Sequence, residues 1–339
     1  MGKGTVRLAA VQPRWRAEDY ATSDAFTARV CGLAARAVAG APGPALVAFP
    51  ELWALPLLAT AAGAGERLAE GLWAAAGTLV RRRGLRWTAL ALRRRWRWSS
   101  AAYADLGVAA FAMWTEAFGE AARATGATVV AGSGFFPTVA YEAARGLHVA
   151  DARAHNLALV VAPTGAVVAR ASKVFLTEGL EQRVGLARGR LEDLPVVDTP
   201  VGRVAVAVCL DGWYHHVLER LDGLGAQVLV QPSANAASWT RPWPPDPSVD
   251  EGGAWLGRGL RAGLIGRAHL RYGVNPMLVG VLAPLALEGR STVVVRTAVQ
   301  PAPPPDGAWT AEHGILAIAS DATEEDVVVV DVPHPDDLD

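Results

Sequence analysis

The feature that most constrains the fold of this 339-residue chain is an apolar run that ends on a cysteine. Residues 204–208 are small or β-branched, and Gly202 and Gly212 bound the run, a pattern typical of a strand buried on both faces. Residues 213–221 then predict a helix. Cys209 therefore ends a buried strand, at the sheet edge where open α/β sheets bind ligands. Because free cysteine is also a common buried apolar residue, this position alone does not make Cys209 catalytic.

Composition excludes several classes of protein. With 51% hydrophobic residues and a net charge of -1, the chain is neither disordered nor generally basic, so we expect no nucleic-acid partner. Cys31 and Cys209 form no disulfide framework, which favours a reducing compartment, and Cys31 is expected to be a small residue in a helix core. The N-terminus lacks the apolar core of a signal peptide, and no apolar run reaches the roughly 20 residues of a membrane span. We expect a cytoplasmic protein.

Lysine is scarce in this chain. Lys3 and Lys173 are the only lysines among the 32 basic residues. Arginine stays protonated in proteins, whereas a lysine can be tuned or can act as a compact point charge. Lys173 follows a strand–turn–strand pattern over residues 157–170. Composition leaves two interpretations open, a chance surface lysine and a functional one.

Strands and helices alternate along the rest of the chain, which predicts an α/β fold. A helix capped by Ser23 is expected, and residues 234–256 are expected to form a long loop. The expected strands cover residues 5–12, 45–51, 128–132, 203–209, 226–232, 272–282, 290–297, 314–320 and 326–332. Glu51 closes the second of these strands. Its apolar neighbours favour a partly buried carboxylate with a raised pKa over a surface glutamate at a helix start.

Residues 66–124 are expected to be helical and are rich in arginine. Within residues 81–98, eight arginines are interleaved with Trp87, Trp96 and Trp98. Such a segment can lie on an anionic membrane or contact a partner. The favoured interpretation is a solvated face whose tryptophans pack on the body of the protein or across a subunit contact.

Three residues at predicted strand or hairpin ends have complementary chemistry: Glu51, Lys173 and Cys209. An isolated thiol is only a few per cent thiolate at neutral pH. A glutamate can accept its proton, and an ammonium group can stabilise both a thiolate and a developing oxyanion.

The motifs around these residues resemble the nitrilase superfamily of carbon–nitrogen hydrolases over nearly the whole chain. They occupy residues 47–52, 156–176, 202–211 and 224–235, in the order and at roughly the spacing of that family. The resemblance implies one domain over residues 1–339, a four-layer α-β-β-α sandwich that pairs into an eight-layer homodimer or higher homo-oligomer, and no cofactor or metal. Relative to that family, residues 66–124 are expected to be a helical insertion. Residues 333–339 are expected to form a short acidic tail.

By the same resemblance, Glu51 is the general base, Lys173 stabilises the oxyanion and Cys209 is the nucleophile. The backbone N–H of Leu210 completes the oxyanion site. A second glutamate in many members follows the lysine, and Glu181 matches its position best, with Glu178 as the competitor.

The residues after the cysteine depart from the family. Tyr214 is followed by His215 and His216 where relatives often carry Pro-Glu. Because no other ligand spacing accompanies the two histidines, helix-start residues are favoured over a metal site. Leu210 stands where nitrilases usually carry tryptophan, so the motif resembles the amidase and carbamoylase branches more closely.

These features predict hydrolysis of a small amide or N-carbamoyl substrate through a thioester on Cys209. Nitrile hydrolysis, acyl transfer to an amine by the same residues, and a non-catalytic binding module on this fold are the alternatives. The residues proposed to line the substrate pocket are Trp53, Trp213, Asn235, Trp239 and Trp243, and a place in the protein core is an equal alternative for the four tryptophans.

Overall fold

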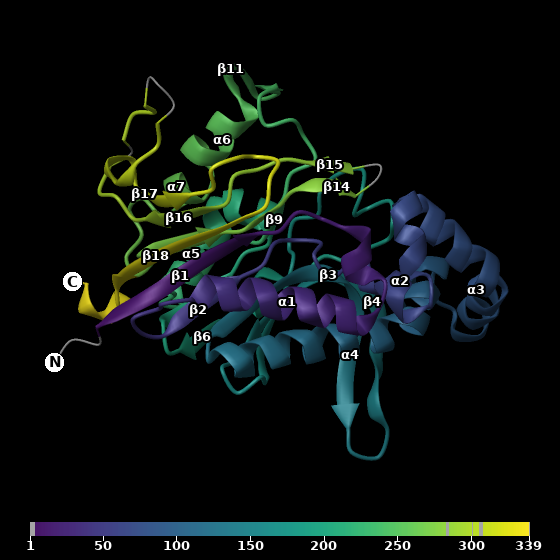
Figure 1. Ribbon diagram of the computed structural model, residues 1–339. Helices are drawn as coiled ribbons and strands as arrows, with labels where there is room; N and C mark the ends of the chain where they lie inside the picture. Colours follow the sequence, from purple (N-terminus) through teal and green to yellow (C-terminus); the bar gives the residue numbers. More distant parts are fainter. Residues whose placement is uncertain (1–3, 283–284, 300, 305–307, 339) are drawn as a thin grey trace.

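Two six-stranded sheets pack face to face, and helices cover the outer faces, which confirms the predicted four-layer α-β-β-α sandwich (Figure 1). The computed structural model describes residues 4–282, 285–299, 301–304 and 308–338. Lys3 and Asp339, the last residue of the predicted acidic tail, lie outside the described residues.

The first sheet is mixed, because β1 pairs in parallel with β2 and antiparallel with β18. Its strands, in spatial order, are β18 (Asp326–Pro333), β1 (Thr5–Gln12), β2 (Ala45–Ala48), β3 (Thr128–Glu142), β4 (Gly146–Val161) and β5 (Val167–Ser172). Alternate side chains of a strand face opposite sides of a sheet. Leu8 and Ala10 accordingly belong to the core between the sheets, whereas Ala9 and Val11 belong to the core beneath the helices.

Helices α1 (Ser23–Val38) and α4 (Trp98–Thr125) cover the outer face of this sheet, and α2 (Leu57–Ala61) and α3 (Leu72–Arg94) continue that layer at one end (Figure 1). The cap of α1 is Thr22 and not the predicted Ser23, because the Thr22 side chain accepts the N–H of Ala25. Trp114 of α4 is fully buried and donates its indole N–H to Ala131 of β3 at 3.0 Å. Helix α4, in the second half of the predicted helical region over residues 66–124, therefore contributes to the core.

The second sheet contains the strand that leads to Cys209. Its strands, in spatial order, are β17 (Ile315–Ile318), β16 (Thr292–Val295), β12 (Tyr272–Asn275), β8 (Val228–Val230), β7 (Gly202–Val206) and β6 (Val196–Thr199). Strands β7 and β8 are parallel, and Val204 pairs with Val228. Helices α5 (His215–Gly223) and α7 (Leu260–Gly263) pack on this half of the molecule, and a 3₁₀ turn over Cys209–Trp213 connects β7 to α5. The helix predicted for residues 213–221 therefore begins two residues later, at His215, and ends at Gly223.

The segment predicted as a loop over residues 234–256 contains regular structure. The short strands of the fold are β9 (Ser233–Ala234), β10 (Pro242–Trp243), β11 (Asp246–Asp250), β13 (Met277–Leu278), β14 (Gly280–Leu282) and β15 (Leu285–Leu287). Helix α6 (Glu251–Arg258) follows β11, and the Asp250 side chain caps it by accepting the N–H of Gly253 at 2.6 Å. The glycines and prolines of this segment are typical of a loop, but the segment forms a hairpin and a capped helix.

Strands β3 and β4 are much longer than predicted and form a hairpin that projects from the sheet (Figure 1). The first of these strands is predicted to end at residue 132, and Gly134 and Pro137 beyond it are residue types that usually weaken or end a strand. The register shifts beside Pro137, and this irregularity lets the strand continue through a proline.

The predicted acidic tail folds back on the start of the chain. The N–H of His334 donates to the Gly4 carbonyl at 2.8 Å, and the N–H of Gly4 donates to Asp337 at 3.0 Å. Within the described part of the chain, we found no helix with the length and apolar character needed to cross a membrane.

Candidate active site

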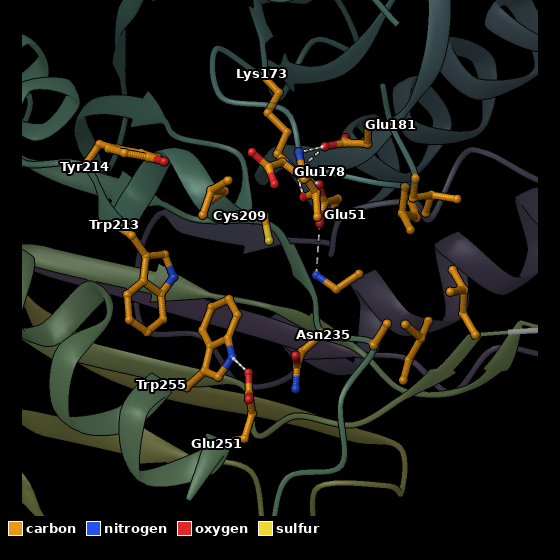
Figure 2. A pocket seen from close by; sticks show the side chains of 18 of the residues that line it. Glu51, Lys173, Glu178, Glu181, Cys209, Trp213, Tyr214, Asn235, Glu251 and Trp255 are labelled. Atoms are coloured by element: carbon orange, nitrogen blue, oxygen red, sulfur yellow. Dashed lines mark hydrogen bonds and ion pairs between the residues drawn. The ribbon is translucent and has the colours of Figure 1, made fainter. Parts of the chain in front are cut away.

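Three chain segments meet at one end of a cavity of about 590 Å³. Glu51 lies in the turn after β2, Lys173 directly follows β5, and Cys209 follows β7. Figure 2 shows the side chains of Glu51, Lys173 and Glu181 pointing toward one another beside Cys209. The fold thus brings the residues predicted from strand ends into one cluster.

The turn that carries Glu51 is held by β3. Leu52 has a positive φ of 64°, and its N–H donates to the Ser133 hydroxyl at 3.2 Å. A Cβ at Gly132 would lie only 2.2 Å from the carbonyl oxygen of Pro50, so no other residue fits there. The close approach of β3 to this turn fixes the position of Glu51.

Cys209 lies in a strained turn. Its φ is 49°, a left-handed conformation that is rare for a residue with a side chain and is concentrated at functional sites. The Gln231 side chain holds this turn by donating to the Cys209 carbonyl at 2.7 Å. Gly212 makes room for Gln231, since a Cβ there would lie 2.4 Å from that side chain.

Lys173 is buried between two carboxylates. Its side chain is 1% exposed, and Nζ lies 2.7 Å from Oε1 of Glu51 and 3.0 Å from Oε2 of Glu181. The N–H of Thr177 donates to the same Glu181 oxygen at 2.7 Å. Glu178 is instead exposed, although it lines the cavity. Of the two glutamates left open by the sequence, Glu181 is the one that contacts the lysine.

Asn156 belongs to the site but was not assigned to it from the sequence. Its amide donates to Glu51 at 2.8 Å and to Glu181 at 2.6 Å, and the side chain is fully buried. Its carbonyl accepts the N–H of Lys173 at 2.8 Å. The available signal was a polar amide at the start of the apolar run over residues 157–162.

Asp211 connects the cysteine turn to the lysine segment. Its two carboxylate oxygens accept the N–H groups of Val174 at 2.9 Å and Phe175 at 2.8 Å. Burial raises the pKa of Asp211 to about 7, and these two hydrogen bonds oppose that shift.

The charges of the cluster are strongly coupled. Burial raises the pKa of Glu51 above its ordinary value, although the Lys173 ammonium opposes this shift. Burial and the charge of Glu51 raise the pKa of the Cys209 thiol. Burial alone lowers the pKa of Lys173, but the charge of Glu51 and the other nearby anionic groups outweigh it, so the net pKa is raised. The cluster therefore favours a charged lysine and a protonated thiol beside Glu51.

Aromatic side chains form the wall of the cavity farther from the cluster. Trp213 and Trp255 meet edge to face, with ring centroids 5.1 Å apart, and Trp243 stacks on Trp213 at 6.2 Å. Trp255 donates its indole N–H to Glu251 at 3.3 Å (Figure 2). Asn235 also lines the cavity, and its amide donates to the Ala237 carbonyl at 3.0 Å.

Two residues predicted to line the pocket lie elsewhere. Trp53 is fully buried in the core beneath the helices, where it packs edge to face with Tyr20. Trp239 packs on Gly252, where a Cβ would lie 2.4 Å from the indole nitrogen. Neither lines the cavity, because both side chains fill the protein interior; Trp213, Asn235 and Trp243 do line it.

The paired histidines begin a helix, as predicted. Tyr214 precedes α5, and His215 and His216 form its first turn. Nδ1 of His215 lies 3.2 Å from Glu219 within this helix. Across the described ranges, no group of three or more His, Cys, Asp or Glu side chains is arranged to hold a metal ion.

The fold and this cluster define an α-β-β-α protein with a buried cysteine-based site. The sequence profile described as carbon-nitrogen hydrolase matches residues 7–249. The chain therefore belongs to the carbon-nitrogen hydrolase family, which confirms the resemblance to the nitrilase superfamily.

Solved structures of an amidase from Nesterenkonia sp. AN1 share the fold. A double mutant in complex with acrylamide has a TM-score of 0.61 and 19% sequence identity, and the match covers 99% of this chain and 93% of that chain. A mutant with the acetamide moiety of fluoroacetamide added covalently at the active-site cysteine has a TM-score of 0.60, 18% identity and coverages of 99% and 92%. A mutant in complex with butyramide has a TM-score of 0.60, 18% identity and coverages of 99% and 94%. A comparison with curated proteins gave no match.

Proposed function

We propose that this carbon-nitrogen hydrolase cleaves the C–N bond of small amide or N-carbamoyl substrates through a thioester on Cys209. The observation that carries this proposal is the buried cluster in which Cys209 lies beside Glu51 and Glu51 is paired with Lys173. The amides recorded with the Nesterenkonia amidase support the substrate class.

In the first step, the Cys209 sulfur attacks the substrate carbonyl carbon while Glu51 accepts the thiol proton. The raised pKa of the thiol favours proton transfer in concert with attack over a resting thiolate. Negative charge develops on the carbonyl oxygen. The Lys173 ammonium can stabilise it together with the N–H of Leu210, which lies in the first turn of a 3₁₀ helix, where backbone donors lack helical partners.

In the second step, the C–N bond breaks, and Glu51 returns its proton to the departing nitrogen. Ammonia or an amine leaves, and the acyl group remains on sulfur. Glu51 then accepts a proton from a water molecule that attacks the thioester. The carboxylic or carbamic acid departs, and Cys209 regains its proton.

Glu181 and Asn156 are positioning residues in this scheme. Glu181 pairs with the Lys173 ammonium as a second carboxylate, and Asn156 bridges Glu181 and Glu51. We also propose that the chain acts as a single domain that pairs into a homodimer or higher homo-oligomer, as the family resemblance implies, and that it works in the cytoplasm, as its cysteine usage favours.

Ammonia release from a panel of amides, ureas and nitriles tests this function. We expect turnover of amides or ureas by the wild type and by Cys31→Ala, and none by Cys209→Ala. Fluoroacetamide should add to the wild-type protein and to Cys31→Ala, with the mass gain localised to Cys209. Turnover by Cys209→Ala would overturn the nucleophile assignment.

The same panel separates the alternatives. Turnover of nitriles, with no turnover of amides or ureas, would indicate nitrile hydrolysis and contradict amide hydrolysis. An acyl hydroxamate that forms faster than free acid when hydroxylamine is added would indicate acyl transfer. No turnover and no labelling of Cys209 would indicate a binding module.

A further inference from the structure

Helix α3 presents apolar side chains on two opposite sides. One side packs on the body of the protein through Ala75, Leu79 and Trp87, which are buried. On the other side, Leu85 is 92% exposed and Leu92 is 77% exposed. Ala89 lies between them and is also exposed, so spacings of four and three residues place the three side chains on one stripe. We call Leu85, Ala89 and Leu92 the exposed stripe.

Arginines flank the exposed stripe. Residues 81–98 contain eight arginines, and residues 71–104 contain no aspartate or glutamate. Arg83 and Arg86 contact Asp105 of α4. On the helix surface, Arg81 lies on one side of the stripe and Arg82, Arg86 and Arg93 lie on the other.

The tryptophans of this segment do not cover the stripe. Trp87 donates its indole N–H to Asp105 at 2.9 Å, and Trp98 packs edge to face on Trp87 at 5.1 Å. Trp98 also donates to Thr88 at 3.2 Å. Trp87 is buried, which confirms the predicted packing for this tryptophan, whereas Trp98 is 42% exposed. These contacts hold α3 against α4 while the opposite side of α3 stays exposed.

An apolar cavity of about 420 Å³ lies beside this helix. It is formed by α2, α3 and α4, and Trp73 and Val80 of α3 line it with 61% and 45% of their surfaces exposed. Figure 1 shows α3 at the edge of the molecule, beyond α2. The helix is therefore accessible to an extended surface.

We propose that α3 lies on an anionic membrane surface, with the exposed stripe in the interfacial layer and the flanking arginines on the lipid phosphates. An exposed apolar stripe bordered by cations is typical of interfacial helices, which lie in the membrane plane and do not span it. Anionic headgroups attract such side chains, and the arginine stems can extend outward while their methylenes stay on the apolar side.

The two other candidate partners fit this surface less well. A symmetric contact with a second copy of α3 would place its arginines against the same arginines of the partner. A nucleic acid would place phosphates opposite Leu85 and Leu92, which gain nothing from that contact. An anionic bilayer satisfies both the charges and the exposed stripe.

Flotation of the full-length protein with vesicles tests this inference. We expect binding to phosphatidylcholine vesicles that contain phosphatidylglycerol, little binding to phosphatidylcholine alone, and release as salt shortens the range of the charges. Leu85→Gln/Leu92→Gln should weaken binding by about tenfold or more, because two leucines leave the apolar layer. Arg82→Gln/Arg93→Gln should weaken it by a similar factor.

Matched controls lie on other faces of the molecule. Val168→Gln/Val329→Gln replaces exposed apolar side chains of β5 and β18, and Arg153→Gln/Arg190→Gln removes the same charge from exposed positions. Both controls should bind vesicles like the wild type. Unchanged thermal unfolding of all variants would show that the fold is intact.

Three results would overturn the inference. The first is failure to bind anionic vesicles at low salt. The second is binding that Leu85→Gln/Leu92→Gln leaves unchanged while duplex DNA displaces the protein from vesicles, which would indicate a general polyanion site. The third is dissociation of an oligomer by Leu85→Gln/Leu92→Gln in sedimentation, without loss of vesicle binding, which would assign the stripe to a subunit contact. None of these tests depends on catalytic turnover.

Discussion

Asp211 accepts the backbone N–H of Val174 at 2.9 Å, and this hydrogen bond joins the turn that carries Cys209 to the segment that carries Lys173. The N–H of Phe175 completes the contact at 2.8 Å. A buried carboxylate two residues after the cysteine therefore fixes the backbone next to the lysine. The proposed nucleophile and the proposed oxyanion stabiliser are thus held in one rigid unit.

The pKa of Asp211, raised by burial to about 7, predicts a pH-dependent contribution to stability. The folded protein binds this proton more tightly than the unfolded chain, whose aspartate titrates near 3.9. Stability from this group is therefore fully present below about pH 4 and is lost as the pH rises through about 7, by an amount on the order of 4 kcal/mol.

Asp211→Asn, a neutral replacement of similar shape, should remove this dependence. Urea unfolding at pH 5 and pH 7.5 measures it. We expect the free energy of unfolding of the wild type, relative to Asp211→Asn, to be lower at pH 7.5 than at pH 5. Parallel pH curves for the two proteins would contradict the assignment.

Glu51 must be ionised to act as a base, and burial raises its pKa. Activity should therefore fall as the pH drops through a value above that of a solvent-exposed glutamate. The acid limb of kcat/KM against pH measures this pKa in the free enzyme. Glu51→Gln should lower kcat/KM by roughly 10²- to 10⁴-fold, as expected for loss of a general base. A variant that keeps both the rate and the acid limb would exclude Glu51 as the base.

Glu181 and Glu178 form a matched pair for mutation, because both line the cavity but only Glu181 contacts Lys173. Glu181→Gln removes a charged partner of the buried ammonium and should lower kcat/KM by about 10- to 100-fold, the usual effect of losing a hydrogen bond to a charged group. Glu178→Gln should change kcat/KM by less than about threefold. Steady-state kinetics on one amide decide between them, and equal effects would contradict the role of Glu181.

The aromatic wall predicts a preference for amides with a large apolar group. Its cavity of about 590 Å³ is much larger than acetamide requires. Trp213→Ala should raise the KM of a phenyl-bearing amide by about tenfold or more, because it removes both the apolar contact and the edge-to-face partner of Trp255.

The same change should leave the kinetics of acetamide nearly unaltered. Trp73→Ala, on the surface of α3, serves as the control and should alter neither substrate. If both substrates lose activity equally in Trp213→Ala, then Trp213 supports the cysteine turn and does not select the substrate.

The local sequence pattern was sufficient to predict the central strands and to single out three residues of the cluster, Glu51, Lys173 and Cys209. The apolar run over residues 5–12 forms β1 with the predicted bounds, and the runs before Glu51 and Cys209 form β2 and β7. These strands are buried on both faces, so each one appears in the sequence as a continuous apolar run. Such a run can be recognised without knowing which other elements pack on it. Strands β3 and β4 were underestimated because a partner strand and a local irregularity can carry a strand through glycine and proline.

What the sequence by itself determined is the chemistry at the strand ends: a thiol, a carboxylate and a rare lysine, each following an apolar run. Only the tertiary structure decided which glutamate meets that lysine, because the backbone between Lys173 and Glu181 had to fold back on itself. It also decided that Trp213 faces the cavity while Trp53 fills a core, since packing determines where an aromatic side chain lies. The identity of a side chain determines which chemistry it can perform. Long-range packing determines which other residues lie close enough to take part in that chemistry.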